Sequence, residues 1–124
     1  MPKASKESAP QVQDAGVMVG RYAQLGDYTV GFETFREDAD SAPILVGLPD
    51  DRCQCPHWGY VVAGRVVFAY QDHEEVYEAG DAYYAPPGHA TRIAGGTEIV
   101  EFSPTAELAK TIEVMTRNLA ALPA

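Results

Sequence analysis

Short runs of alternating apolar and polar residues, separated by turn-forming residues, extend from residue 17 to residue 102. Runs of this length and period indicate β-strands, and their close spacing is typical of an all-β sandwich or barrel. Glycine, proline and aspartate fill the breaks, where they provide the dihedral angles that tight reversals need. The pattern predicts strands at Val17–Gln24, Tyr28–Arg36, Pro43–Gly47, Cys53–Ala63, Arg65–Tyr70, Glu75–Glu78, Ala82–Ala85, Ala90–Ile93 and Glu98–Phe102.

The two ends of the chain differ from this central region. The first sixteen residues are polar, contain two prolines and have no hydrophobic period, so we expect a flexible tail there. Near the other end, Ser103 and Pro104 suit a helix start, and apolar residues then recur at helical spacing up to Leu119. We expect this apolar stripe to pack either against the outer face of the barrel, which is the simpler alternative, or against a second subunit. The predicted organisation is a tail, a β-barrel and a C-terminal helix over residues 1–16, 17–103 and 104–124.

Composition and charge narrow the classes of function. A chain of 124 residues with 46% hydrophobic residues suits one domain with a packed core. Nine basic and eighteen acidic residues give a net charge of −9, which disfavours binding to nucleic acid or to anionic membranes. The sequence contains no apolar run of transmembrane length and no apolar stretch typical of a secretion signal. We therefore expect a cytoplasmic protein with neither nucleic acid nor membrane as its partner.

Sulfur and imidazole groups gather in two separate segments. Residues 53, 55 and 57 have the same parity, so an extended strand would direct Cys53, Cys55 and His57 to one side. His89 follows the Pro-Pro-Gly turn of the second segment. Cysteines this close rarely form an unstrained disulfide, and thiolate with imidazole favours zinc, with copper or iron as alternatives. We predict a divalent transition metal on these four residues, although buried cysteine and histidine are also common in ordinary cores.

Two motifs resemble those of the cupin superfamily. The segment from His57 to Gly64 is similar to the end of the first cupin motif. The segment from Gly80 to Gly88 matches the second motif, which is a glycine, five residues and then Pro-x-Gly. The resemblance covers roughly residues 28–103. It implies a small single-domain cupin, a β-barrel also described as a double-stranded β-helix or jelly roll, with a cavity for a small molecule.

The resemblance also implies where a metal would bind. Metal-binding cupins typically use His-x-His, then a glutamate, then a later histidine. Counted back from Gly64, His57 stands at the glutamate position and Cys53 at the second histidine position. The remaining two positions hold Asp51 and Thr91. The implied ligand set is therefore a substituted one at neighbouring positions.

Three functions remain open at this point. The first is a metal-dependent enzyme acting on a small organic molecule, with one coordination position free. The second is a non-enzymatic cupin with a closed, four-ligand structural metal site, and the third is a metal-free cupin that binds its ligand through tyrosines. The resemblance and an exposed N-terminal strand edge also predict a homodimer. The candidate cavity residues are Tyr60, Tyr83, Thr91 and Glu101.

Glu101 lies in the last predicted strand, next to Phe102. Its carboxylate could serve as an additional ligand or as a base if it entered the barrel. An outward, solvated carboxylate is the simpler expectation, because glutamate is rarely buried.

Overall fold

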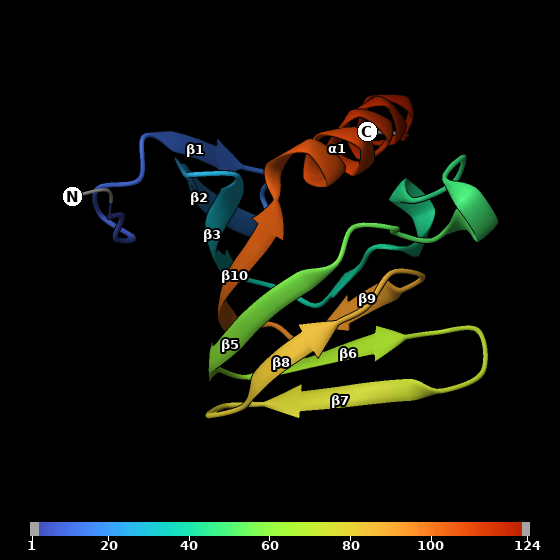
Figure 1. The fold of residues 1–124 in the computed structure, drawn as a ribbon. Coiled ribbons are helices and arrows are strands. Elements are labelled where there is room, and N and C mark those ends of the chain that lie inside the picture. Colours follow the sequence, from blue (N-terminus) through green and yellow to red (C-terminus); the bar gives the residue numbers. More distant parts are fainter. Residues whose placement is uncertain (1–2, 123–124) are drawn as a thin grey trace.

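Two antiparallel sheets face each other in the computed structural model, which describes residues 3–122 (Figure 1). The larger sheet has the strand order β1-β2-β3-β10-β5-β8, and the smaller sheet has the order β4-β9-β6-β7. The strands are β1 Gln11–Asp14, β2 Met18–Leu25, β3 Tyr28–Phe35, β4 Ala39–Asp40, β5 His57–Ala63, β6 Arg65–Ala69, β7 Glu74–Glu78, β8 Ala82–Ala85, β9 Ala90–Ile93 and β10 Glu98–Pro104. The predicted all-β jelly roll is confirmed.

The main hydrophobic core lies between the two sheets. Val61 of β5 and Ile99 of β10 are almost fully buried there, and they belong to one cluster with Val66, Phe68 and Ile93 from the smaller sheet. Burying each of these side chains stabilises the fold by about 1.5–3 kcal/mol. The alternation of inward and outward residues along each strand therefore fixes which side chains can reach the interior.

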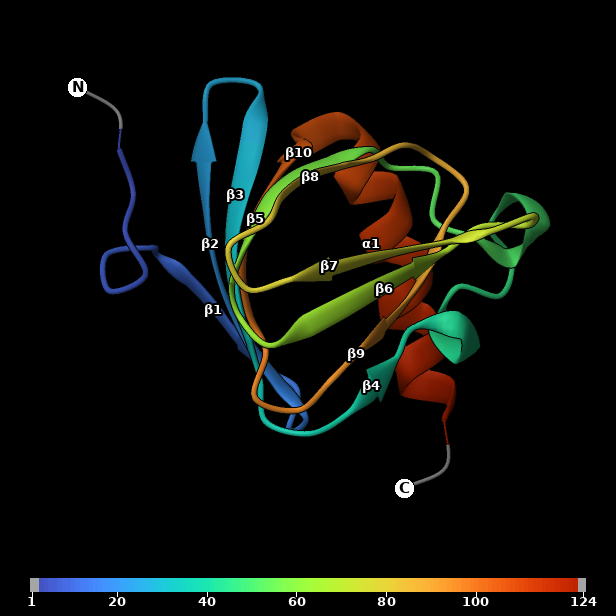
Figure 2. The ribbon, with the colours of Figure 1, turned by 90° about the horizontal axis from the view of Figure 1, so that it is seen from below.

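Helix α1 (Thr105–Ala121) closes one end of the space between the sheets (Figure 2). The apolar stripe predicted for this helix faces that space. Asn118 attaches the helix to the neighbouring turn, because its side-chain amide donates hydrogen bonds of 2.8 Å to the backbone carbonyl oxygens of Ile44 and Val46. No helix in the described part of the chain is long and apolar enough to cross a membrane.

Two predictions about the N-terminal half are wrong. Strand β1 lies inside the segment expected to be a flexible tail, and it pairs with β2 from Gln11 to Asp14. Residues 1–2 of that tail and residues 123–124 at the helix end lie outside the described residues. The predicted strand at 43–47 is instead the short 3-10 helix η1 (Ala42–Ile44), because Pro43 has no N–H to contribute to a strand. A second 3-10 helix, η2 (Pro49–Asp51), follows it.

The long strand predicted from Cys53 to Ala63 is also shorter in the structure. Strand β5 begins only at His57, after Pro56. Cys53 forms an isolated antiparallel bridge with His89 instead of continuing the strand. This bridge brings the two ligand-bearing segments together.

Candidate metal centre

Cys53, His57 and His89 converge on one point in the interior. All three are buried, and one ligand atom from each lies within 4.8 Å of the other two. The Sγ atom of Cys53 is 3.7 Å from Nε2 of His57. Tetrahedral zinc, with bonds of about 2.0–2.3 Å, holds its ligand atoms roughly 3.3–3.8 Å apart. Small side-chain movements would therefore bring these three donors around one ion.

Backbone hydrogen bonds hold the two ligand-bearing segments side by side. The Cys53 N–H donates to the His89 carbonyl oxygen at 2.8 Å, and the N–H groups of Gly88 and His89 both donate to the Cys53 carbonyl oxygen. Gly88 has a positive φ of 98°, which glycine adopts without strain, and this lets the chain turn into β9 immediately after the two prolines. His57 then joins the pair as the first residue of β5.

Hydrogen bonds orient both histidine rings so that Nε2 is available. Nδ1 of His89 is 2.9 Å from the carbonyl oxygen of Pro86, which can only accept, so this nitrogen carries the hydrogen. Nδ1 of His57 lies 2.7 Å from Oγ of Ser103 and 3.4 Å from Oε1 of Glu101, and the nearby carboxylate favours a hydrogen there as well. Partners of this kind fix the tautomer of metal-binding histidines.

Burial keeps both imidazoles in the neutral form that binds metals. It lowers the pKa of His57 to about 4. Burial also lowers the pKa of His89 to about 4, together with the repulsion that the charged forms of the two histidines would exert on each other. Burial also raises the pKa of the Cys53 thiol, so this sulfur keeps its proton at neutral pH unless a cation replaces it. Neutral nitrogen donors and one displaceable thiol proton fit a divalent transition metal.

Cys55, predicted as a fourth ligand, lies outside this cluster. It is fully buried in a hydrophobic cluster with Leu45 and Cys53, but its thiol donates to the carbonyl oxygen of Pro56 at 3.4 Å and is not one of the converging donor atoms. Because the chain before His57 is not an extended strand, equal parity does not place Cys55 on the side of Cys53. The geometry therefore assembles three of the four predicted ligands.

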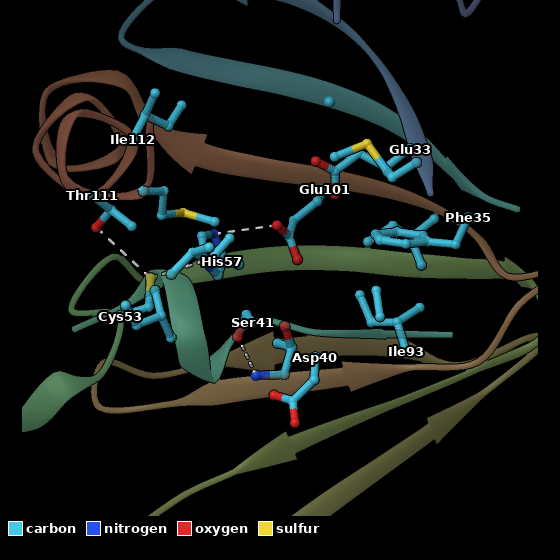
Figure 3. A pocket seen from close by; sticks show the side chains of 18 of the residues that line it. Glu33, Phe35, Asp40, Ser41, Cys53, His57, Ile93, Glu101, Thr111 and Ile112 are labelled. Carbon is cyan, nitrogen blue, oxygen red and sulfur yellow. Dashed lines mark hydrogen bonds and ion pairs between the residues drawn. The ribbon is translucent and has the colours of Figure 1, made fainter. Parts of the chain in front are cut away.

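A cavity of about 450 Å³ lies beside the three ligands, between the sheets and helix α1 (Figure 3). Its walls are mostly apolar, and a volume of this size suits one small organic molecule. The apolar side chains that line it include Met18, Phe35, Val66, Phe68, Ile93 and Ile99 from the strands, and Leu108, Ile112, Met115 and Leu119 from the helix. Thr111 of the helix lies next to the metal cluster, with its Oγ1 3.8 Å from Sγ of Cys53.

Two carboxyl groups, Glu33 and Glu101, line the same cavity (Figure 3). The hydroxyl of Tyr22 donates a 2.6 Å hydrogen bond to Oε2 of Glu33, and the hydroxyl of Tyr83 donates a 2.6 Å hydrogen bond to Oε2 of Glu101. Burial raises the pKa of both carboxyl groups to about 7, and the charge of Glu101 adds to the effect on Glu33. Each carboxyl group therefore has one oxygen fixed by a tyrosine.

Glycines make room for both tyrosine rings on the inner face of the larger sheet. A Cβ atom on Gly59 would overlap the ring of Tyr83, and a Cβ atom on Gly31 would lie 2.8 Å from the ring of Tyr22. Gly59 pairs with Tyr83 across β5 and β8, and Gly31 pairs with Tyr22 across β3 and β2. These glycines let the rings lie flat on the sheet and bring their hydroxyls to the carboxyl groups.

The four predicted cavity residues occupy different environments. Thr91 and Glu101 line the cavity, so the expectation that Glu101 points outward is wrong. Tyr83 is buried behind Glu101 and contacts its carboxyl group without lining the cavity. Tyr60 lies on the opposite face of the sheet and is 47% exposed, so it is not a cavity residue.

The sequence prediction missed three polar groups near the site, namely Glu33, Ser103 and Thr111. Ser103 lies on the same side of β10 as Glu101, so its inward position follows by parity only once Glu101 is known to face the interior. Glu33 lies on the same face of β3 as the buried Phe35. Phe32 is an apolar residue on the opposite face, so the alternation of apolar and polar residues does not show which face of β3 is buried. No sequence pattern marks Thr111, because its position depends on how the helix packs.

Comparisons with known proteins define the fold class. The sequence matches no protein-family model and no curated protein. Among solved structures, the polyketide cyclase RemF from Streptomyces resistomycificus superposes with a TM-score of 0.58 at 13% identity, covering 84% of this chain and 79% of RemF. An RmlC-like cupin from Shewanella frigidimarina NCIMB 400 superposes with a TM-score of 0.55 at 19% identity, covering 82% of this chain and 88% of that protein.

A third neighbour is KdgF from Halomonas sp., with a TM-score of 0.52 at 23% identity, covering 76% of this chain and 86% of KdgF. These neighbours share the fold of the chain at low sequence identity. The chain has the cupin fold, as its two motifs predicted.

Proposed function

We propose that this cupin binds one divalent transition metal on Cys53, His57 and His89 and acts on a small, largely apolar organic molecule in the adjoining cavity. The observation that carries the proposal is the position of the three donors, which are buried, correctly oriented and placed at the wall of a cavity large enough for such a molecule. Zinc suits two imidazoles and one thiolate best, with copper and iron as alternatives.

Three protein ligands favour an open metal site over a closed structural one. A four-ligand structural site would need Cys55, whose sulfur is not among the donor atoms that lie within 4.8 Å of one another. A tetrahedral ion held by three side chains has one position left for a ligand, as in catalytic zinc sites. A metal bound here would supply Lewis acidity toward an oxygen atom of the bound molecule.

Glu101 is the residue best placed to move a proton. Tyr83 fixes its Oε2, while Oε1 lies near the metal-site residue His57 and the carboxyl group lines the cavity. Glu101 would take a proton from one carbon of the molecule, whose electron pair stays on the molecule, and return it at another atom. Such a reaction needs no oxidant or reductant, and the apolar walls exclude water from it.

Isomerisation, dehydration and ring closure of a small carbonyl compound all belong to this class of reaction. RemF, which shares the fold, is named as a polyketide cyclase, and ring closure is one member of the class. Binding without turnover is the second candidate, and one observation favours it: a thiolate ligand such as Cys53 donates charge and weakens the Lewis acidity of the metal.

Metal content tests the first part of the proposal. Protein expressed without added metal should contain close to one equivalent, and zinc should raise its melting temperature because the ion binds the folded state. The double variant His57→Ala/His89→Ala should lose both properties. His73→Ala, which changes an exposed histidine in a turn, is the matched control and should retain both. A wild-type protein that neither contains nor takes up metal would contradict the proposal.

Solvent deuterium exchange tests the second part. Metal-loaded protein is incubated in D₂O with a panel of small cyclic ketones, and exchange at the carbon next to the carbonyl is followed by NMR. Exchange with at least one compound should fall at least about 100-fold in Glu101→Gln, which should still bind metal. Specific binding of ketones without any exchange would favour the second candidate, a binding protein.

A further inference from the structure

The carboxyl group of Glu33 lines the cavity on the side of Glu101 that is remote from the metal-site residues (Figure 3). Ser103 of β10 contacts His57, and Glu101 and then Ile99 lie next along the inner face of this strand. Glu33 of β3 pairs with Ile99, so it lies one strand and two positions beyond Glu101. Diagonal neighbours of this kind are about 7–8 Å apart. A molecule that reaches both the metal site and Glu33 must therefore have two separate polar ends.

One oxygen atom of Glu33 is free to bind a molecule in the cavity. Tyr22 donates its hydrogen bond to Oε2, and no described residue donates to Oε1. The one buried side-chain oxygen or nitrogen of the described chain that lacks a partner is Oγ1 of Thr34, so Oε1 of Glu33 is accessible from the cavity. An ionised carboxylate only accepts hydrogen bonds. The group that binds Oε1 must therefore be a donor.

The aspartate, glutamate, lysine and arginine residues that line the cavity are all of one sign. They are Glu33, Asp38, Asp40 and Glu101, and no lysine or arginine of the described chain lines this space. Asp38 and Asp40 are exposed, so they lie where the cavity opens to solvent. Acidic groups at the opening attract a cation, and Glu33 provides its partner inside. An anionic group meets no basic side chain along the same path.

A bound cation would also offset the cost of burying the Glu33 carboxylate. Burial, and after it the charge of Glu101, raise the pKa of Glu33 to about 7, because both disfavour the ionised form. A positive group at Oε1 favours the ionised form and opposes both effects. A cationic donor therefore gains an interaction at this position that a neutral donor does not.

Aromatic side chains flank Glu33 on the cavity wall. Tyr22 contacts its carboxyl group, and Phe35 lies two positions along the same face of β3. Both residues line the cavity. An ammonium group within about 6 Å of an aromatic ring is attracted to the face of that ring. A carboxylate between aromatic side chains is therefore suited to an alkylammonium group.

We propose that the molecule bound in the cavity is an amphipathic amine, whose ammonium group binds Oε1 of Glu33 while an oxygen atom at its other end faces the metal site. This inference rests on the proposed function, because it names the substrate class of the same site. Glu33 is then a specificity-determining residue, and Tyr22 positions its carboxyl group. Glu101 keeps the separate role of moving the proton.

Calorimetric titration with two matched ketones tests this substrate class. Both probes are cyclohexanones with a substituent opposite the carbonyl group, which is dimethylaminomethyl in one and isobutyl in the other. The two substituents have the same shape, but only the amine is cationic at neutral pH. Zinc-loaded wild-type protein should bind the amine, and Glu33→Gln should bind it at least about 30-fold more weakly, because the variant removes the charged partner. The affinity for the isobutyl ketone should change less than about 3-fold, since this compound makes no ion pair.

Glu78→Gln is the matched control, because it removes the same charge from an exposed position on β7 of the smaller sheet. It should bind both ketones like the wild type. Retained binding of the isobutyl ketone by Glu33→Gln verifies that this variant is folded. The same titrations without zinc separate this inference from the metal site. The selective loss in Glu33→Gln should persist in metal-free protein, since Glu33 is not one of the three metal-site residues.

Equal binding of the amine by wild type and Glu33→Gln would overturn the inference and leave the proposed metal site intact. A wild-type protein that binds the isobutyl ketone but not the amine would do the same. Failure to bind either ketone would also overturn it, and metal content would then decide the metal site by itself. A selective loss in a protein that takes up no metal would support the amine and contradict the metal site.

Discussion

At the scale of single residues, the chemistry of the cavity depends on which face of a strand each side chain occupies. On β10, Ile99, Glu101 and Ser103 face the interior, whereas Phe102 lies on the outer face and is 39% exposed. A shift of one residue would exchange these two sets. The pairing of β10 with β3 and β5 fixes the register, and it thereby places a carboxyl group and a hydroxyl beside His57.

The buried carboxyl group of Glu33 should make stability depend on pH. Its pKa of about 7 in the folded protein lies above the ordinary value of 4.5, mainly because of burial. The folded state therefore keeps a proton that the unfolded state releases, and the resulting stability is lost as the pH rises from about 4.5 through 7. The Glu33→Gln variant cannot titrate at this position, so the stability that it loses over this pH range should be smaller than the wild-type loss by on the order of 2 kcal/mol.

Urea unfolding of metal-free protein at about pH 5 and about pH 8 measures the difference. The wild type should lose more stability than Glu33→Gln between these two pH values. Identical losses in both proteins would mean that the Glu33 carboxyl group titrates as it does in water.

The inward orientation of Glu101 could not be predicted from sequence alone, for a physical reason. Parity identifies the inner face only when the outer face is polar, and here the outer face carries Phe102, Tyr60 and Trp58. The convergence of Cys53, His57 and His89 was predicted from the equal parity of residues 53 and 57 and from the turn that precedes His89. The separation of Cys55 did not, because it depends on the irregular backbone before β5.

At the scale of elements, a close contact fixes the turn that follows β5. Gly64 ends β5 with a positive φ of 85°, and a Cβ atom there would overlap the backbone and side chain of Thr97. The Thr97 hydroxyl in turn accepts a hydrogen bond from the Arg65 N–H at 3.0 Å. The turn after β5 is therefore closed by a contact that only glycine permits.

Gly64→Ala should destabilise the fold by about 2–4 kcal/mol, because it adds both backbone strain and an overlap with Thr97. Gly80→Ala is the matched comparison, since Gly80 also has a positive φ but nothing lies within 4 Å of its Cβ position. We expect a loss of about 1 kcal/mol there. Denaturant midpoints measure both effects, and equal losses would contradict the proposed contact.

The attachment of helix α1 leads to another prediction. Asn118→Ala removes two hydrogen bonds to the turn around η1 and should destabilise the protein by about 1–3 kcal/mol. Arg117→Ala removes only an exposed ion pair with Glu113 and should cost less than about 0.5 kcal/mol. Hydrogen exchange in α1 should increase in the first variant alone. Equal protection in both variants would show that the helix is held by its apolar stripe without Asn118.

The strands were easier to predict than the irregular segments. Alternation and turn residues located β2, β3, β5, β6, β8, β9 and β10, because these strands have a buried face and are bounded by glycine, proline or aspartate. Strand β7 is mostly exposed and was located by the turn residues on either side of it. Strand β1 was missed because all of its residues are exposed, so no hydrophobic period marks it. Segment 43–47 was assigned to a strand because its apolar residues fill the space under α1, where burial does not require extended backbone.

At the scale of the whole molecule, the inner and outer faces of the larger sheet carry different kinds of side chain. The inner face carries His57 and the carboxyl groups of Glu33 and Glu101, while the outer face carries exposed apolar side chains such as Trp58 and Tyr84. Short-range sequence motifs predicted the fold class, since they reflect the turns that the jelly roll needs. The cavity and its cover by α1 could not be predicted in this way, because they arise from contacts between residues far apart in the chain.

Cobalt substitution tests the central claim most directly, because Co²⁺ reports both sulfur ligation and coordination number by absorption. The wild-type protein and Cys55→Ser should each bind one Co²⁺ with a thiolate charge-transfer band in the near ultraviolet and intense tetrahedral bands in the visible range. Cys53→Ser should lose the charge-transfer band. A band that survives in Cys53→Ser and disappears in Cys55→Ser would contradict this account of the centre.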